Sequence, residues 1–218
     1  ALADRRDRQT RFILTGSVSP IISDVAAESL TGRARRLSLS GFSLSEVGPE
    51  NWERLWLRGG FPDAYTKQLD VVAMEVRQQY LASVLTRDLP ALTEIKLTGE
   101  QVFRLFRFIA HHHGQYWNHS EVAGALGVNS RTVQRYVELF KGVFLVRELP
   151  PYFENFGKRL RKAPKLYIRD TGLLHALLNI RNKSELNAFA RYGASWEGFG
   201  VEQLVSLLQL TEDQCYTW

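Results

Sequence analysis

The stretch VNSRTVQRYVELFKGVFLVRELPPY, residues 128–152, combines the pattern of an amphipathic helix with the start of a β-strand. Asn129 or Ser130 can cap a helix over residues 131–141, because a short polar side chain accepts hydrogen bonds from the first backbone N–H groups of a helix. Gly142 then ends the helical pattern. The β-branched and aromatic residues of VFLVREL, which follow Gly142, predict a strand. The expected apolar face of the helix consists of Val133, Tyr136, Val137 and Phe140.

Three further segments of the sequence belong with this helix. A longer helix is expected over residues 99–113, with an inward face made of Val102, Leu105, Phe106 and Ile109. A short helix over residues 121–126 follows, with Asn118 or Ser120 as its cap. The string PKLYIRD is a second strand pattern. Helix, helix, turn, helix and hairpin is the order of a winged helix-turn-helix, and it predicts such a domain over residues 98–170.

The outward face of the central helix and the loop between the two strands carry the candidate nucleic-acid contacts. A helix that enters the major groove presents polar or basic side chains to the DNA, while its apolar face holds it on the domain. Arg and Gln side chains form hydrogen bonds with base edges, and Arg also binds phosphates. The candidates on the helix are Arg131, Gln134 and Arg135. The loop, or wing, offers a phosphate clamp without an acidic residue, made of Lys158, Arg159, Arg161, Lys162 and Lys165.

Docking of another protein is the alternative interpretation of these charges, because a charged helix face is often only solvated. Glu138 and Glu148 favour this alternative, since their carboxylates weaken the positive field. The net charge, 28 − 23 = +5 over 218 residues, favours a polyanionic partner only modestly. Double-stranded DNA and a protein partner therefore both stay open from the residues alone.

No complete site for a nucleotide or a metal ion is expected from the residues. RFILTGSVSP predicts a strand with Thr15 and Ser17 at its carboxyl end, where ligands bind in open α/β sheets. A phosphate-binding loop of the form G-x-x-x-x-G-K-[ST] does not occur in the sequence. The consecutive side chains of His111–His113 point about 100° apart on a helix and cannot converge on one ion. The dipole at a helix C-terminus, which favours imidazolium, explains them better.

The other segments are expected to be mainly helical. A short strand is expected around Leu37–Leu44, where apolar and polar residues alternate. Residues 52–97 have helical spacing, interrupted by a turn at RGGFP. The helix over residues 71–85 is expected to have an inward face made of Val72, Val76, Tyr80 and Val84. TGLLHALLNI and SWEGFGVEQLVSLLQL predict two more helices, and Cys215–Trp218 predicts the start of a strand.

The bulk composition indicates a cytoplasmic protein without a membrane span. No run approaches the roughly 20 continuous apolar residues that cross a bilayer. The first residues, ALADRRDRQTR, lack the apolar core of a secretory signal. The single cysteine, Cys215, allows no disulfide within the chain, as expected in a reducing compartment.

A series of strings with a fixed order extends over nearly the whole chain. The strings are RFILTGSVSP, ESLTGRARRLSLSGFSLSEV, LWLRGGFPDAY, YLASVLTRDLPAL, WNHSEVAGALGVNSRTVQRYVELFKGVFLVRELPPYFENFGKRLRKAPKLYIRDTGLLHALL and GASWEGFGVEQL. Together they resemble the prokaryotic AAA+-type ATPases that carry an N-terminal P-loop domain, a winged helix and a C-terminal nuclease-like domain of unknown function. In such proteins the Walker motifs lie upstream of the TGS strand. The resemblance therefore implies that this chain is a fragment that lacks the P-loop and the end of the C-terminal domain.

The resemblance also implies roles for individual residues. Thr15 and Ser17 match the place of a γ-phosphate sensor. Arg33 of TGR and Arg58 of LRGG match lid or finger arginines, which stabilise charge on a transferring phosphoryl group, although Arg33 fits a structural ion pair equally well. Glu197 of SWEGFG matches the helix acid of the nuclease-like domain. A helix acid stabilised by the helix dipole is the alternative for Glu197.

The expected fold is therefore mainly α with short β elements. Its expected parts are the end of an α/β nucleotide-binding domain (1–48), a helical lid (49–97), the winged helix (98–170) and the start of a nuclease-like domain (171–218). The implied parent uses ATP and Mg²⁺ and could form a homo-oligomer, whereas the fragment is expected to bind neither and to lack ATPase activity. A winged-helix transcription regulator without ATPase activity is the alternative, and a toxin–antitoxin or defence module is a third hypothesis.

Overall fold

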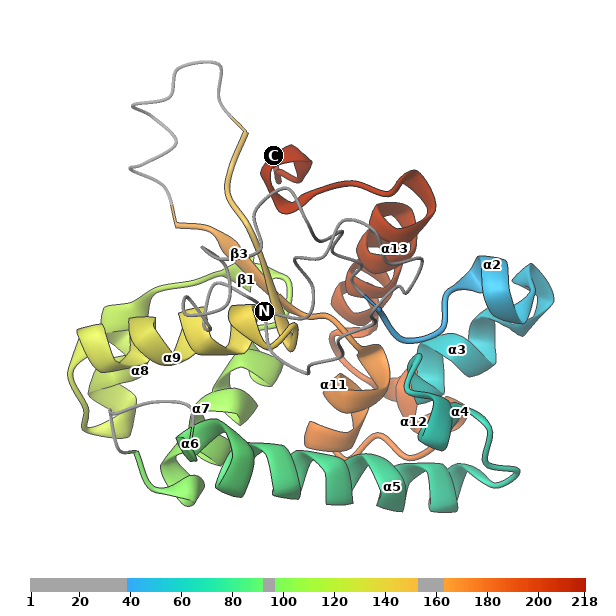
Figure 1. The fold of residues 1–218 in the computed structure, drawn as a ribbon, viewed down its shortest axis with the longest axis horizontal. Helices are drawn as coiled ribbons and strands as arrows, with labels where there is room; N and C mark the ends of the chain where they lie inside the picture. Colours follow the sequence, from blue (N-terminus) through green and yellow to red (C-terminus); the bar gives the residue numbers. More distant parts are fainter. Residues whose placement is uncertain (1–38, 92–96, 153–162) are drawn as a thin grey trace, which may run out of the picture.

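Helices dominate the computed structural model, which describes residues 39–91, 97–152 and 163–218 (Figure 1). The first part contains α2 (Leu44–Val47), η1 (Pro49–Asn51), α3 (Trp52–Arg58), α4 (Pro62–Tyr65), α5 (Asp70–Ser83), η2 (Val84–Asp88) and α6 (Leu89–Ala91). The second contains α7 (Gly99–His111), β1 (Gln115–Tyr116), α8 (His119–Leu126), α9 (Ser130–Gly142) and β2 (Val146–Leu149). The third contains β3 (Lys165–Ile168), α11 (Thr171–Leu177), α12 (Lys183–Ala188), α13 (Tyr192–Leu208) and η3 (Glu212–Gln214). The predicted class, mainly α with short β elements, is confirmed.

Local capping explains why α7, α8 and α9 begin where they do. Thr98 accepts a hydrogen bond from the Gln101 N–H at the start of α7. Asn118 caps α8, and Asn129 caps α9 by accepting from the Arg131 N–H at 2.8 Å. The inward faces predicted for α7 and α9 are buried, as expected from their helical spacing. These three helices are therefore determined mainly by local sequence.

The β-strands form one small antiparallel sheet in the order β1-β3-β2. Val146 pairs with Ile168 and Leu149 pairs with Lys165 in the β2–β3 register. The end of the chain extends this edge, because the Thr217 N–H donates to Pro150 O and the Tyr152 N–H donates to Thr217 O. The strand start predicted at the C-terminus is thus a single parallel bridge between Pro151 and Thr217.

One hydrophobic core joins α5, η2, α7, α9, the sheet and α11. Met74 and Leu81 of α5 and Leu85 of η2 belong to the same buried cluster as Phe106 of α7 and Phe140 of α9. The rings of Phe106 and Phe140 are 5.0 Å apart. Leu173, Leu174 and Leu177 of α11 complete the cluster. The core therefore continues across the domain boundaries expected at residues 97 and 170.

A buried carboxylate fastens the start of α11 to the turn after α3. Asp170 caps α11 by accepting from the Leu173 N–H at 2.8 Å, and its other oxygen accepts from the Gly60 N–H at 2.7 Å. The Thr171 hydroxyl donates to Trp56 O at 2.7 Å. The approach is so close that a Cβ on Gly172 would lie 2.0 Å from the carbonyl oxygen of Arg58. Only glycine fits this contact between two backbones.

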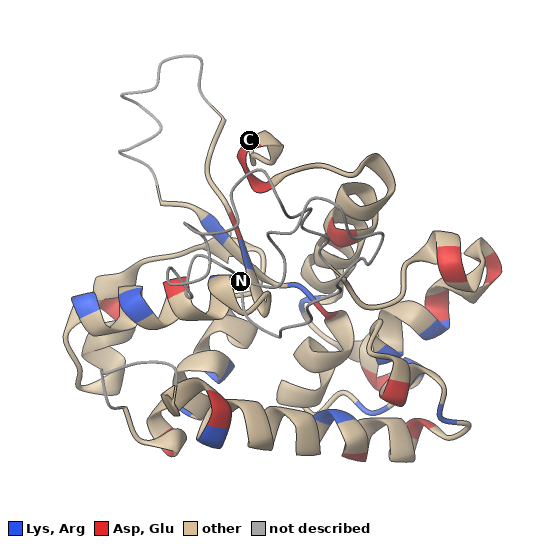
Figure 2. Cartoon of the chain, in the orientation of Figure 1, with Lys and Arg blue, Asp and Glu red and all other residues tan. Residues whose placement is uncertain are grey.

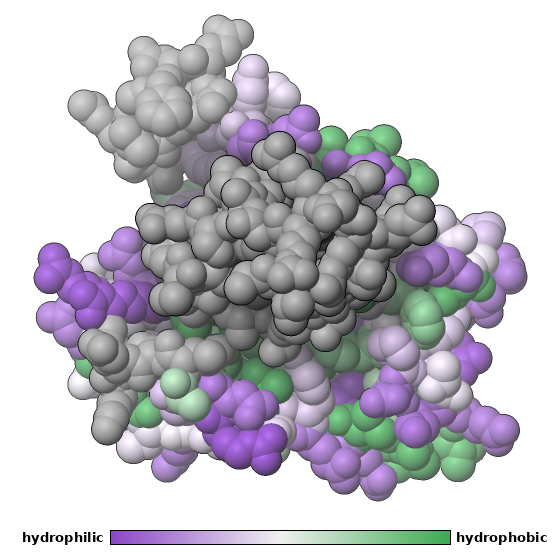
Figure 3. Space-filling model, viewed as in Figure 1, coloured by the Kyte–Doolittle hydropathy of each residue, from purple (hydrophilic) through white to green (hydrophobic). Residues whose placement is uncertain are grey.

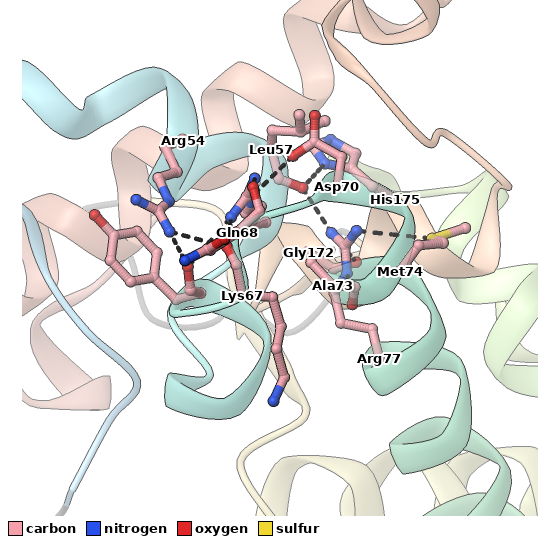
Figure 4. Close-up of polar contacts among 12 residues, drawn as sticks. Arg54, Leu57, Lys67, Gln68, Asp70, Ala73, Met74, Arg77, Gly172 and His175 are labelled. Carbon is pink, nitrogen blue, oxygen red and sulfur yellow. Dashed lines mark hydrogen bonds and ion pairs between the residues drawn. The ribbon is translucent and has the colours of Figure 1, made fainter.

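A buried guanidinium connects the same two segments to α5 (Figure 4). Arg77 donates to Leu57 O at 2.8 Å and to Gly172 O at 3.3 Å, and it also donates to Ala73 O of its own helix. Burial lowers the pKa of Arg77, and the charge of Asp170 opposes that shift. We call Asp170, Arg77 and the Gly60 and Gly172 backbones the α3–α5–α11 junction.

One expectation for the N-terminal half is wrong and another holds only in part. The part of the segment 37–44 that the structure describes contains no strand, because the Ser43 N–H and hydroxyl both donate to Glu46 and start the helix α2. Of the face predicted for residues 71–85, Tyr80 and Val84 pack against the core, but Val72 is exposed, whereas Ala73, Met74 and Leu81 are buried. The contacts of Arg77 at the junction set the rotation of this helix, which its apolar spacing alone did not reveal.

Replacing Asp170 by Ala should destabilise the fold by about 2–4 kcal/mol. The variant loses a helix cap and leaves the buried Gly60 N–H without an acceptor. Urea unfolding at neutral pH measures this cost. Asn182→Ala is the matched control, because Asn182 caps α12 in a more exposed place, and it should cost only about 0.5–2 kcal/mol. Equal costs for the two variants would contradict a special role for the junction.

Candidate nucleic-acid interface

The outer face of α9 carries the three helix candidates predicted from the sequence. Arg131, Gln134 and Arg135 are exposed, while the opposite face of α9 is buried in the core. A shallow hollow on this face is lined by Asn129, Arg131, Thr132 and Arg135. The structure therefore brings the two guanidinium groups and the first turn of α9 together on one surface.

The first turns of α9 carry two exposed arginines, Arg131 and Arg135. Within the described part of the chain, no acidic side chain forms an ion pair with Arg131 or Arg135. Figure 2 shows basic positions at the end of α9 that lies next to α8. By contrast, Glu202 of α13 pairs with both Arg147 and Arg169. The start of α9 therefore carries two positive charges that no described acidic side chain pairs with.

The other end of α9 is occupied by an ion-paired group of three side chains. Lys141 lies 3.1 Å from a carboxylate oxygen of Glu138 and 2.7 Å from one of Glu148, which is on β2. These two carboxylates raise the pKa of Lys141 against the lowering effect of burial. The ammonium of Lys141 is therefore ion-paired with two carboxylates and is not available to a phosphate.

Lys165, which the sequence assigns to the phosphate clamp, is ion-paired in the structure. Its ammonium pairs with Glu197 of α13 at 3.1 Å, and the Tyr167 hydroxyl donates to the same carboxylate oxygen at 2.6 Å. Burial and the charge of Glu197 raise the pKa of Tyr167. Glu197 thus joins α13 to β3, and neither the dipole of its own helix nor a metal ion is needed to explain its place.

Several predicted residues lie outside the described part of the chain. They are Thr15, Ser17, Arg33, Lys158, Arg159, Arg161 and Lys162. Their assignments as phosphate sensors, a finger arginine and a phosphate clamp stay predictions from the sequence.

Arg58, the second finger candidate, has a structural role. It is only 7% exposed and pairs with Asp70 at 2.7 Å. Its guanidinium also donates to the carbonyl oxygens of Tyr65, Lys67 and Gln68, so it closes the loop between α4 and α5. A guanidinium saturated in this way is not presented to a phosphate group.

The helix dipole does not explain His113, one of the three histidines at the end of α7. His113 is buried, and its Nδ1 accepts a hydrogen bond from the Ile168 N–H at 3.0 Å. Burial lowers the pKa of His113 to about 3, so the ring is neutral and does not act as an imidazolium at the helix end. Among the described residues, no group of three or more His, Cys, Asp or Glu side chains is placed to hold a metal ion.

A buried Ser–His pair was not found from the sequence. His175 Nε2 lies 2.8 Å from the Ser195 hydroxyl, and His175 Nδ1 lies 3.0 Å from Leu57 O. Because a carbonyl only accepts, Nδ1 carries the proton and the Ser195 hydroxyl donates to Nε2. The Trp56 indole N–H completes the set by donating to Ser195 at 2.9 Å. Both side chains are 0% exposed, so the pair joins α3, α11 and α13 and is not open to a substrate.

An apolar hollow lies between α2 and α13. Leu44 and Phe199 line it together with Leu204 and Leu207, and the last two are well exposed. Figure 3 shows apolar surface near the C-terminal end of α13. Among the residues that the structure describes, no helix is both long enough and apolar enough to cross a lipid bilayer.

Comparison with known proteins places this chain in a family. Residues 49–184 match the domain of unknown function DUF8612, and the chain belongs to this family. The uncharacterized protein Rv2008c of Mycobacterium tuberculosis and the uncharacterized protein Mb2031c of Mycobacterium bovis are each 41% identical to it over 217 residues. The alignment covers 100% of this chain and 48% of each relative, so the chain spans about half their length. No solved structure matches the chain.

The two buried histidines should make the fold less stable as the pH falls. Burial lowers the pKa of His175 to about 4 and that of His113 to about 3, below the usual value of 6.5. The unfolded chain therefore binds protons first, and the free energy of unfolding should fall between about pH 6.5 and pH 4. His175→Gln should reduce this slope by up to about 1.4 kcal/mol per pH unit. Urea unfolding across this pH range measures it, with the more exposed His111→Gln as control, and an unchanged slope in His175→Gln would contradict the assignment.

Proposed function

We propose that this chain binds double-stranded DNA through α9, as the winged-helix part of an AAA+-type ATPase. The order α7, β1, α8, α9, β2 and β3 is the order of a winged helix, with α9 in the place of the recognition helix that enters the major groove. The observation that carries the proposal is the outer face of α9. It combines two arginines without an acidic partner among the described residues and a glutamine, over a helix fixed by its buried face.

The chemistry of these side chains fits a duplex. A guanidinium can bind guanine O6 and N7 together, and a glutamine amide can bind adenine N6 and N7. Arg131 and Arg135 lie four residues apart and therefore on neighbouring turns of the same face. The side chains of one face can thus contact a short run of bases, while any charge that meets phosphates adds affinity without sequence preference.

The ATPase part of the proposal rests on the sequence resemblance. Two of the strings that carry it, LWLRGGFPDAY and the run ending in IRDTGLLHALL, meet at the α3–α5–α11 junction. Since the helices that match the lid share a core with α7 and α9, we infer that lid and winged helix move as one body. In the parent protein, ATP binding or hydrolysis would then reposition α9 together with any bound DNA.

A protein-docking winged helix is the rival function, and a transcription regulator without ATPase activity is the other alternative. The apolar hollow beside α13 is the observation that favours contact with a protein. It lies on elements other than α9, so a protein partner at α13 and a duplex at α9 do not exclude one another.

Replacing Arg135 by Ala should weaken binding of a selected duplex by about 1–3 kcal/mol and relax the base preference at one position. Fluorescence anisotropy at two salt concentrations, with a selected and a random duplex, measures both effects. Arg104→Ala is the matched control, because it removes the same charge from an exposed position on α7. It should change the binding of all duplexes alike and only slightly.

The protein-docking hypothesis expects a different result. Duplex binding would then be weak throughout, and Arg135→Ala would behave like Arg104→Ala. A wild-type chain without salt-dependent duplex binding at low salt would contradict the proposed function.

A further inference from the structure

An acidic side chain stands on the same face of α9 as the proposed DNA contacts. Glu138 is four residues after Gln134 and three after Arg135, so its side chain lies one turn further along the helix. Its side chain is 57% exposed, although it belongs to an ion pair. A duplex bound along this face would therefore meet two guanidinium groups first and a carboxylate next.

Lys141 orients the carboxylate of Glu138 through an ion pair. The ammonium lies 3.2 Å from one oxygen of Glu138 and 3.1 Å from the other. Lys141 also binds Glu148 of β2, whose side chain is 27% exposed. The three groups carry one positive and two negative charges, so a charge of −1 remains. Glu138 is thus oriented, yet its charge is not cancelled.

Such a carboxylate discriminates between the groups that a duplex offers. It repels phosphates, and it can accept a hydrogen bond from the exocyclic N4 amine of cytosine. Each carboxylate oxygen has two lone pairs, so one stays free when Lys141 uses the other. Three residues of helix rise about 4.5 Å and one base step about 3.4 Å, which places the contacts of Arg135 and Glu138 roughly one base pair apart.

We propose that Glu138, oriented by Lys141, is a specificity-determining residue of the α9 surface, which selects cytosine next to the base bound by Arg135 and disfavours non-specific binding. The inference rests on the proposed function, because it requires a duplex on α9. It explains why an acidic residue stands next to outward side chains that suit DNA. The carboxylate of Glu138 lowers the affinity for every duplex, but it raises the ratio of the affinity for the preferred sequence to the affinity for other sequences.

The test compares Glu138→Gln with Glu148→Gln in the whole chain. Both variants remove one negative charge from the same ion-paired group, but only Glu138 belongs to the outer face of α9. Selection from a duplex library with randomised positions gives the base preference of each protein. Anisotropy with a random duplex at several salt concentrations gives the non-specific affinity, and circular dichroism confirms folding.

Glu138→Gln should bind the random duplex several-fold more tightly than wild type at low salt. Its preference for cytosine at one position should fall by about 10-fold and shift toward adenine, which a Gln amide binds through N6 and N7. Glu148→Gln should also bind more tightly but keep the cytosine preference. If wild type binds duplexes and Glu138→Gln keeps the wild-type preference, the inference is overturned and the proposed function stands. If wild type binds no duplex, both are overturned.

Discussion

The fold depends on one buried charge pair that satisfies backbone groups of three helices at once. Asp170 accepts from the start of α11 and from the turn after α3, while Arg77 donates to the end of α3 and the start of α11. Burial raises the pKa of Asp170 and lowers that of Arg77, and each charge reduces the shift of the other. Buried charges of this kind are stable only when they are hydrogen-bonded and face an opposite charge, and both conditions hold here.

The position of α9 follows from this junction through the shared core. Asp170 lies two residues after the end of β3, and α11 packs its leucines into the same cluster as α7 and α9. Because the inner face of α9 is buried in the core and anchors the helix, its outer face needs no apolar residue and can carry charge. Stability and binding are thus assigned to opposite faces of one helix, which lets Arg131 and Arg135 remain free of acidic partners in the described structure.

The elements that sequence could predict are those determined by neighbours in the chain. The caps of α8 and α9 and the inward faces of α7 and α9 depend on residues within four positions, and they were confirmed. Contacts between distant residues decided the features that the sequence did not reveal. Lys165 is neutralised by Glu197, which lies 32 positions away, and His113 is neutral because α13 and β3 bury it. The outer face of α9 was predictable from the helical periodicity. The ion pairs of Lys141 with both Glu138 and Glu148 were not, because they depend on β2 lying beside α9.

The central claim is that the arginines on the outer face of α9 contact DNA while the arginine at the junction only supports the fold. Nuclear magnetic resonance of the arginine Nε–H groups tests it most directly, since each guanidinium gives its own signal. On titration with a selected duplex at low salt, the signals of Arg131 and Arg135 should shift and exchange more slowly with water, while that of Arg77 stays unchanged. Unchanged signals of Arg131 and Arg135 at saturating duplex would contradict the account.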